Sequence, residues 1–130
     1  MNMRSKWMMA LVALSLAVVA PRLMGQDAAE VSVQQANGMS QQGALLLDVR
    51  EESEYAALHA PQAKLMPLGD VSSRLKEIDA YKEKPVVVVC RSGRRSAKAV
   101  AILKEAGFTQ VSNVQGGMIA WEQAGLATIK

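Results

Sequence analysis

The sequence predicts one α/β domain in three layers, with a central parallel sheet and helices on both of its faces. Two short runs are typical of strands buried on both faces: Ala44–Val49, which is apolar apart from Asp48, and Val86–Val89, which is four valines. Helical patterns lie between these runs, and Gly107 and Gly125 directly follow two of them, as expected of helix stop residues. Strands that alternate with helices favour a parallel sheet.

Further elements follow from weaker patterns. We expect additional strands at Ala63–Met66 and Gln110–Val114. The predicted helices cover Val33–Gln42, Ser53–Leu58, Val71–Tyr81, Ser96–Ala106 and Met118–Ala124. Trp121 is expected in the core, and the solvent-facing side of the third helix is expected to carry Arg74, Lys76, Glu77 and Asp79.

Composition and charge exclude several classes of protein. The chain has 130 residues, of which 50% are apolar, so it is globular material. Three of its 15 basic residues and none of its 12 acidic ones fall within residues 1–25, which leaves the remainder neutral. Together with scattered aromatic residues, this neutrality argues against nucleic-acid binding.

The first 25 residues are typical of a signal peptide. Arg4 and Lys6 precede the apolar run Trp7–Ala20, which as a helix would span roughly 21 Å and is too short for a bilayer core of roughly 30 Å. We expect cleavage after Gly25, a single domain over 26–130, and a periplasmic or secreted protein. The alternative is an uncleaved segment that anchors the chain to the inner membrane, and membrane contact is expected only then.

Cys90 is the only cysteine, so no internal disulfide can form in an oxidising compartment. It ends the valine strand and begins the loop Cys90–Ser96, and ligands of open α/β sheets bind at this end of the strands. Gly93 allows a tight curl in which backbone N–H groups point inward, and the following helix adds its positive end. Such settings lower a cysteine pKa to about 3.5 to 7.5.

The loop therefore predicts an anion-binding cradle around a nucleophilic thiolate. Its charged and turn-forming members, which we expect to bind substrate with their side chains or amides, are Arg91, Ser92, Gly93, Arg94, Arg95 and Ser96. A buried, unreactive structural cysteine is the alternative.

Residues 30–126 resemble a single-domain rhodanese. The resemblance rests on four ordered motifs: Leu46–Glu51 with Glu54 and Tyr55, Leu58–Ala63 with Pro67 and Leu68, Val88–Ser96, and Val114–Gly117 leading to Trp121. Leu58 and Gln62 depart from the glycines that many relatives carry at these positions.

The resemblance implies a sulfurtransferase in which Cys90 accepts a sulfane sulfur as a persulfide and passes it to cyanide or a thiol. Arg95 and the loop amides would hold the persulfide and the donor, with Arg91 as a further substrate-binding candidate. Asp48 and Arg50 would support the loop, and His59, the only histidine, would be structural. No metal and no organic cofactor is required.

The expected partners are a small anionic sulfur donor such as thiosulfate and a thiol or cyanide acceptor, with a protein sulfur acceptor as a further option. The absence of a long apolar surface segment favours a monomer. Cationic groups suit this reaction because both the donor and the departing sulfite are anions.

Other functions fit the sequence less well. A cysteine phosphatase or arsenate reductase would place an arginine at position 96, where this chain has Ser96, and a protein tyrosine phosphatase would have a histidine in place of Val89. A dithiol oxidoreductase needs a resolving cysteine. A non-enzymatic module that carries sulfur or docks on another protein stays open as the alternative from a different class.

Overall fold

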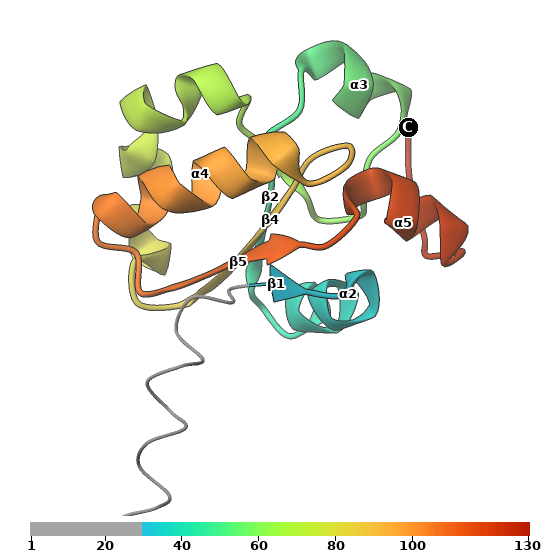
Figure 1. The fold of residues 1–130 in the computed structure, drawn as a ribbon, viewed down its shortest axis with the longest axis horizontal. Coiled ribbons are helices and arrows are strands. Elements are labelled where there is room, and N and C mark those ends of the chain that lie inside the picture. Colours follow the sequence, from blue (N-terminus) through green and yellow to red (C-terminus); the bar gives the residue numbers. More distant parts are fainter. Residues whose placement is uncertain (1–29) are drawn as a thin grey trace, which may run out of the picture.

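The computed structural model describes residues 30–130, so the predicted signal peptide and its cleavage site lie outside the described residues. Five strands, four α-helices and two 3-10 helices follow one another within the described part of the chain (Figure 1). In chain order they are β1 (Glu30–Val31), α2 (Val33–Gln41), β2 (Leu45–Asp48), α3 (Glu52–Ala57), β3 (Lys64–Leu65), η2 (Leu68–Ser73), η3 (Leu75–Tyr81), β4 (Pro85–Val89), α4 (Arg94–Glu105), β5 (Gln110–Val114) and α5 (Gly117–Gln123).

The strands form one parallel sheet in the order β1-β5-β4-β2-β3. In the register of the central strands, Asp48 of β2 lies beside Val89 of β4, and Val88 lies beside Asn113 of β5. The carboxyl ends of these three strands therefore meet at one edge of the sheet, where Cys90 follows β4.

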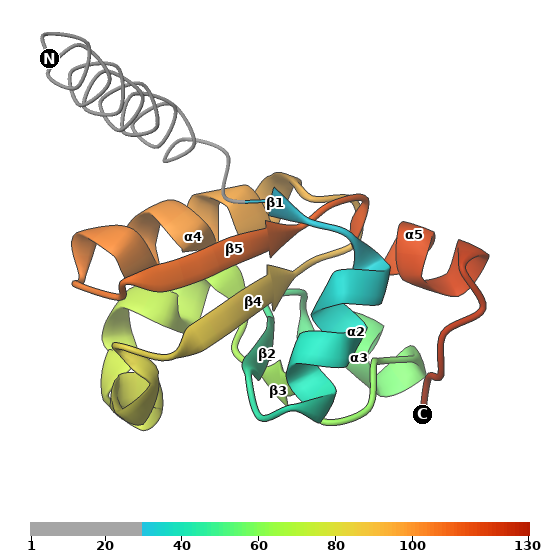
Figure 2. The same ribbon diagram turned by 90° about the horizontal axis from the view of Figure 1, so that it is seen from below.

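Helices cover both faces of the sheet, which confirms the predicted three layers (Figure 2). Successive strand side chains point to opposite faces. Val86 and Val88 pack in one core cluster with Leu103 of α4, whereas Val87 and Val89 pack in a second cluster with residues of α2 and α5. These valines are fully buried, as expected of a strand covered on both sides.

The segment predicted as a helix over Val71–Tyr81 is instead two 3-10 helices, η2 and η3, which are separated at Arg74. The Ser73 hydroxyl donates to the Asp70 carbonyl (3.0 Å), a local bond that competes with an α-helical ladder. Only Val71 and Ile78 are fully buried here, so packing gives the segment no continuous helical stripe.

The prediction that one side of this segment faces solvent is largely confirmed. Lys76, Glu77 and Asp79 are exposed, whereas Arg74 is half-buried and donates to Glu77 at 2.7 Å. The pattern missed the two-residue strand β1, which is too short to show an alternation.

The turn after α3 holds the backbone at Gln62 in the left-handed region, with φ of 67°. The resemblance to rhodaneses implies a glycine at this position, and glycine adopts that conformation without strain. The Ser40 hydroxyl donates to Oε1 of Gln62 at 3.3 Å and ties the turn to α2.

Within the described residues, no helix is both long and apolar enough to cross a membrane. Trp121 on α5 is fully buried, as predicted, and its Nε1 donates to the Ala127 carbonyl at 3.0 Å. This side chain holds α5 and the C-terminal segment against the sheet.

Trp121→Ala is expected to lower the free energy of unfolding by about 3 to 5 kcal/mol, because it leaves a cavity in the core and an unpaired Ala127 carbonyl. Urea unfolding followed by circular dichroism measures this loss. Ile119→Ala on the same helix is the control, since Ile119 is 41% exposed. A similar loss in both variants would contradict the anchoring role of Trp121.

Candidate functional site

Cys90 lies at the floor of the loop between β4 and α4, with 1% of its surface exposed. Its Sγ accepts hydrogen bonds from the Gly93 amide (3.0 Å) and the Ser96 hydroxyl (3.3 Å). Gly93 is the N-cap of α4 and has φ of 114°, a conformation that glycine adopts without strain. The predicted curl at Gly93 therefore brings the start of α4 back over the sulfur.

Two opposing effects act on the Cys90 thiol. Burial raises its pKa, whereas hydrogen bonds from the Ser96 hydroxyl and from the amides of Ser96, Gly93 and Ser92 lower it. The net pKa is below the ordinary value of a cysteine. A buried sulfur with several donors aimed at it is a site for a thiolate or for another sulfur anion bonded to it.

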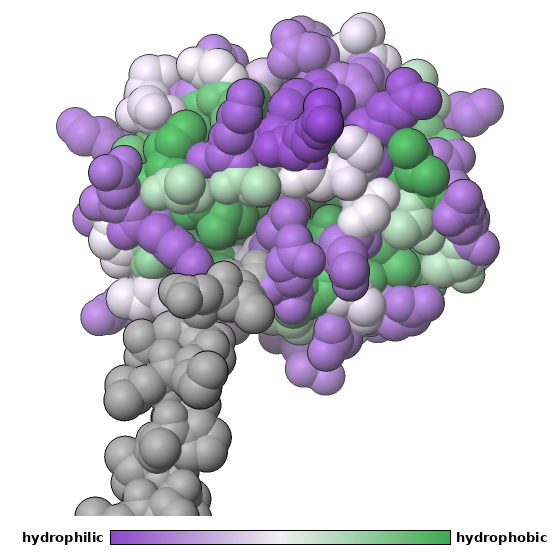
Figure 3. Space-filling model, viewed as in Figure 1, coloured by the Kyte–Doolittle hydropathy of each residue, from purple (hydrophilic) through white to green (hydrophobic). Residues whose placement is uncertain are grey.

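The three loop arginines differ in their surroundings. Arg91 and Arg94 are exposed, and within residues 30–130 neither forms an ion pair. Strongly hydrophilic side chains gather on the surface over α3 and the amino-terminal end of α4 (Figure 3). The predicted helix start at Ser96 is two residues late, because α4 begins at Arg94 and includes Arg95 in its first turn.

Arg95 is held by a carboxylate that the sequence analysis did not assign to the site. Its Nη1 and Nη2 donate to Oε1 and Oε2 of Glu54 at 2.7 and 2.9 Å. Arg95 thereby lowers the pKa of Glu54 to about 2, so the carboxylate is ionised at neutral pH. The residues are 41 positions apart, and no local pattern reveals that they meet.

A second unpredicted residue, Asn113 of β5, braces the loop from below. Its Oδ1 lies 2.5 Å from the Ser96 hydroxyl, and its Nδ2 donates to the Gly93 carbonyl at 3.3 Å. The single proton of the Ser96 hydroxyl is shared between Asn113 Oδ1 and Cys90 Sγ. One side chain thus contacts both residues that direct donors at Sγ. Its place at the carboxyl end of β5, beside β4, is the signal that could have identified it.

The amino-terminal end of α5 fixes the other side of the loop. The amides of Met118 and Ile119 donate to the carbonyls of Cys90 (2.8 Å) and Arg91 (3.1 Å). This approach requires glycine at position 117, because a Cβ there would overlap both carbonyl oxygens.

Asp48 and Arg50 form a buried ion pair, with Arg50 Nη2 at 2.8 Å from Asp48 Oδ2. Arg50 also donates to the carbonyl of Leu58 (2.8 Å), the C-cap of α3, and to the carbonyl of Glu54 within α3 (3.5 Å). Neither side chain hydrogen-bonds to Cys90. The pair instead fixes α3, the helix that supplies Glu54 to the loop.

His59 stands apart from the sulfur. Its ring stacks on Tyr55 with centroids 3.7 Å apart, and its Nδ1 lies 2.8 Å from the Tyr55 carbonyl. Its backbone pairs with Ile129 and so ties the C-terminal segment to the domain. These contacts agree with the structural role that the resemblance implies.

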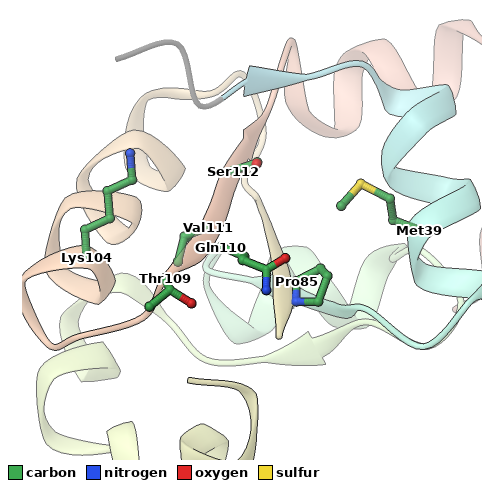
Figure 4. Close-up of a pocket in the computed structure, with 7 residues that line it drawn as sticks. All are labelled: Met39, Pro85, Lys104, Thr109, Gln110, Val111 and Ser112. Atoms are coloured by element: carbon green, nitrogen blue, oxygen red, sulfur yellow. The ribbon is translucent and has the colours of Figure 1, made fainter. Parts of the chain in front are cut away.

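A pocket lies at the opposite end of the sheet, where β4 and β5 begin (Figure 4). It is lined by Met39, Pro85, Lys104, Thr109, Gln110, Val111 and Ser112. Its lining contains no cysteine and no acidic group that could act as a base, so we place the chemistry at Cys90. Among the described residues, no group of three or more histidine, cysteine, aspartate or glutamate side chains could hold a metal ion.

Alkylation of Cys90 by iodoacetamide is expected to titrate below the ordinary cysteine pKa. Ser96→Ala should slow alkylation at neutral pH about tenfold, because a hydrogen bond to a charged group contributes about 1.5 to 3 kcal/mol. Ser92→Ala is the matched control, since Ser92 acts through its amide. Equal rates in both variants would contradict the role of the Ser96 hydroxyl.

Gly117→Ala is expected to destabilise the fold by about 2 to 4 kcal/mol, since the new methyl group meets two backbone oxygens. Gly125→Ala separates this clash from backbone strain: Gly125 has φ of +70°, yet a Cβ there meets nothing within 4 Å. The control should lose only about 1 to 2 kcal/mol. Thermal unfolding measures both, and equal losses would show that strain alone is responsible.

Comparisons with known proteins agree with this geometry. Residues 32–124 match the model of the rhodanese-like domain. The chain is 40% identical over 85 residues to a sulfurtransferase of Allochromatium vinosum, an alignment that covers 65% of this chain and 78% of the relative. It is 35% identical over 88 residues to the thiosulfate sulfurtransferase GlpE of Pseudomonas syringae, covering 68% and 81% of the two chains.

A solved structure gives the same result for the fold. The rhodanese-like domain of the Anabaena protein Alr3790 superimposes with a TM-score of 0.70 at 28% identity, over 78% of each chain. Family model, relatives and fold agree with the resemblance found in the motifs, and the chain belongs to the rhodanese-like domain family.

Proposed function

We propose that this protein is a sulfurtransferase that carries a sulfane sulfur on Cys90 as a persulfide. The observation that carries the proposal is the convergence of donors on Sγ, where the Gly93 amide and the Ser96 hydroxyl lie within 3.3 Å of a buried sulfur. The sulfurtransferase names of its relatives support the reaction class.

The first half-reaction loads the cysteine. The Cys90 thiolate attacks the outer sulfur of a donor such as thiosulfate, a bond forms between Sγ and that sulfur, and the sulfur–sulfur bond of the donor breaks. Sulfite leaves with the electron pair. A thiolate and a dianion give a persulfide anion and a dianion, so charge is conserved, and the loop amides stabilise the anion throughout.

The second half-reaction regenerates the thiolate. Cyanide, or the thiolate of an acceptor, attacks the outer sulfur of the Cys90 persulfide. The bond from that sulfur to Sγ breaks, Sγ keeps the electron pair, and thiocyanate or the acceptor persulfide leaves. The residues proposed for substrate binding are the loop members, which offer the exposed side chains of Arg91 and Arg94 and the backbone amides that point at Sγ.

The location of the protein belongs to the same proposal. We infer export through residues 1–25, which have the charge, length and apolar run of a signal peptide. The mass of the mature chain from the periplasm tests cleavage directly.

Intact-mass spectrometry before and after thiosulfate tests the persulfide. We expect a gain of about 32 Da that cyanide removes; oxidation to a sulfinic acid gives a similar gain but resists cyanide. Cys90→Ser should show no gain. Absence of the cyanide-labile gain despite an alkylatable Cys90 would overturn thiosulfate as donor.

Steady-state turnover then separates an enzyme from a sulfur carrier. An enzyme forms many equivalents of thiocyanate from thiosulfate and cyanide, whereas a carrier that depends on a protein partner stops after one. A single equivalent would favour the non-enzymatic alternative.

A further inference from the structure

Glu54 pairs with the guanidinium of Arg95, the residue that closes the sulfur-binding loop. Both of its carboxylate oxygens accept from Arg95, at 2.7 and 2.9 Å, in the paired geometry by which arginine also binds oxyanions. A sulfonate group of thiosulfate that used Arg95 in this way would have to displace Glu54. The family resemblance assigned Arg95 to the donor, whereas here a residue of the protein already holds it.

The surrounding charges add to this effect. Glu51 and Glu52 accompany Glu54 at the start of α3, and Glu51 contributes to the raised pKa of Arg95. The Cys90 thiolate adds a further negative charge. Against these stand two exposed arginines, Arg91 and Arg94; solvent screens their charges as it screens those of the exposed Glu51 and Glu52. Because Glu54 pairs directly with Arg95, the mouth of the loop is less cationic than its three arginines indicate.

We propose that Glu54 determines specificity by holding Arg95: it disfavours dianionic donors such as thiosulfate relative to the monoanionic persulfide of a thiol whose remaining atoms carry no charge. This inference rests on the proposed sulfur transfer to Cys90. Glu54 acts through Arg95 and does not touch the reacting sulfur, so it is a positioning residue.

The preferred donor reacts by the same substitution. The Cys90 thiolate attacks the outer sulfur of the donor persulfide, a bond from Sγ to that sulfur forms, and the sulfur–sulfur bond of the donor breaks. The donor thiolate leaves with the electron pair. Two monoanions give two monoanions, and no oxidant or reductant is consumed. The leaving group carries one charge, whereas sulfite carries two, so this reaction needs less help from Arg95.

Glu54→Gln is the variant that tests the proposal. Oε1 of Glu54 accepts the Glu51 amide at 3.1 Å and caps α3, and the glutamine oxygen can accept the same bond. The change removes the charge and leaves the side-chain length unaltered. Glu52→Gln is the matched control, because it removes the same charge from the same helix at an exposed residue that does not pair with Arg95.

The measurement is the loading rate of Cys90 in single-turnover experiments, followed by intact mass after acid quench. The two donors are thiosulfate and the persulfide of 2-mercaptoethanol, each over a range of concentrations. For thiosulfate, we expect Glu54→Gln to lower the half-saturating concentration about fivefold with little change in the limiting rate, consistent with the loss of one partly exposed ion-pair partner. For the persulfide, we expect less than a twofold change.

One further variant and the control identify the route. The fivefold decrease in the half-saturating concentration of thiosulfate should disappear in the double variant Glu54→Gln/Arg95→Gln, because the decrease depends on the released guanidinium. Glu52→Gln should show no such decrease. Loading of Cys90 with unchanged thiosulfate kinetics in Glu54→Gln, or an equal gain for both donors, would overturn the role of Glu54 and leave the sulfurtransferase proposal standing. Failure of the wild-type protein to load from either donor would overturn both proposals.

Discussion

The hydrogen bonds that converge on the sulfur of Cys90 are the constraint on which the site depends. A thiolate buried to 1% exposure would be strongly disfavoured without donors, because burial acts against the charged form. The donors come from the loop itself, so the backbone must curl until the Gly93 amide and the Ser96 hydroxyl reach Sγ. The left-handed Gly93 makes this curl sterically allowed, and Asn113 and α5 hold it from two sides.

A second set of interactions connects the loop to β2 and α3. Asp48 ends β2 and holds Arg50, which bonds to carbonyls of α3, and α3 places Glu54 against Arg95 of α4. The buried ion pair thus acts on the loop at a distance, by fixing the helix that supplies the carboxylate. This arrangement explains how Asp48 and Arg50 support the loop without contact to Cys90.

The sequence predicted the fold well where the signal was local. Continuous valines indicated β4, and Gly107 and Gly125 marked the ends of two helices correctly to within a residue or two. The failed helix over 71–81 shows the limit of such patterns: its apolar spacing allowed an α-helix, but the Ser73 side chain and the sparse packing favoured 3-10 turns. Strand β1 exists only because β5 offers it a partner.

The site was predictable in its nucleophile and loop but not in its long-range partners. Cys90 and Gly93 could be read from one strand-loop-helix segment. Glu54 and Asn113 lie 41 and 17 positions from the loop residues that they bind, so their roles depend on the tertiary fold. The arginines illustrate the consequence. Sequence alone counted three positive charges that favour a thiolate, whereas the largest causes that lower the Cys90 pKa are hydrogen bonds from Ser96 and the loop amides, and one of the three charges is matched by Glu54.

Ser96 also bears on the choice between sulfur and phosphoryl chemistry. It stands where a cysteine phosphatase would need its arginine, and its side chain is fully buried between Cys90 and Asn113. A guanidinium cannot take this place without displacing Asn113 and the carbonyl that it holds. The loop thus directs a short hydroxyl at Sγ, whereas Arg91 and Arg94 are exposed and Arg95 pairs with Glu54. Donors so close to Sγ suit one additional sulfur bonded to the cysteine, whereas a tetrahedral phosphoryl group needs a wider loop with a guanidinium facing its oxygens.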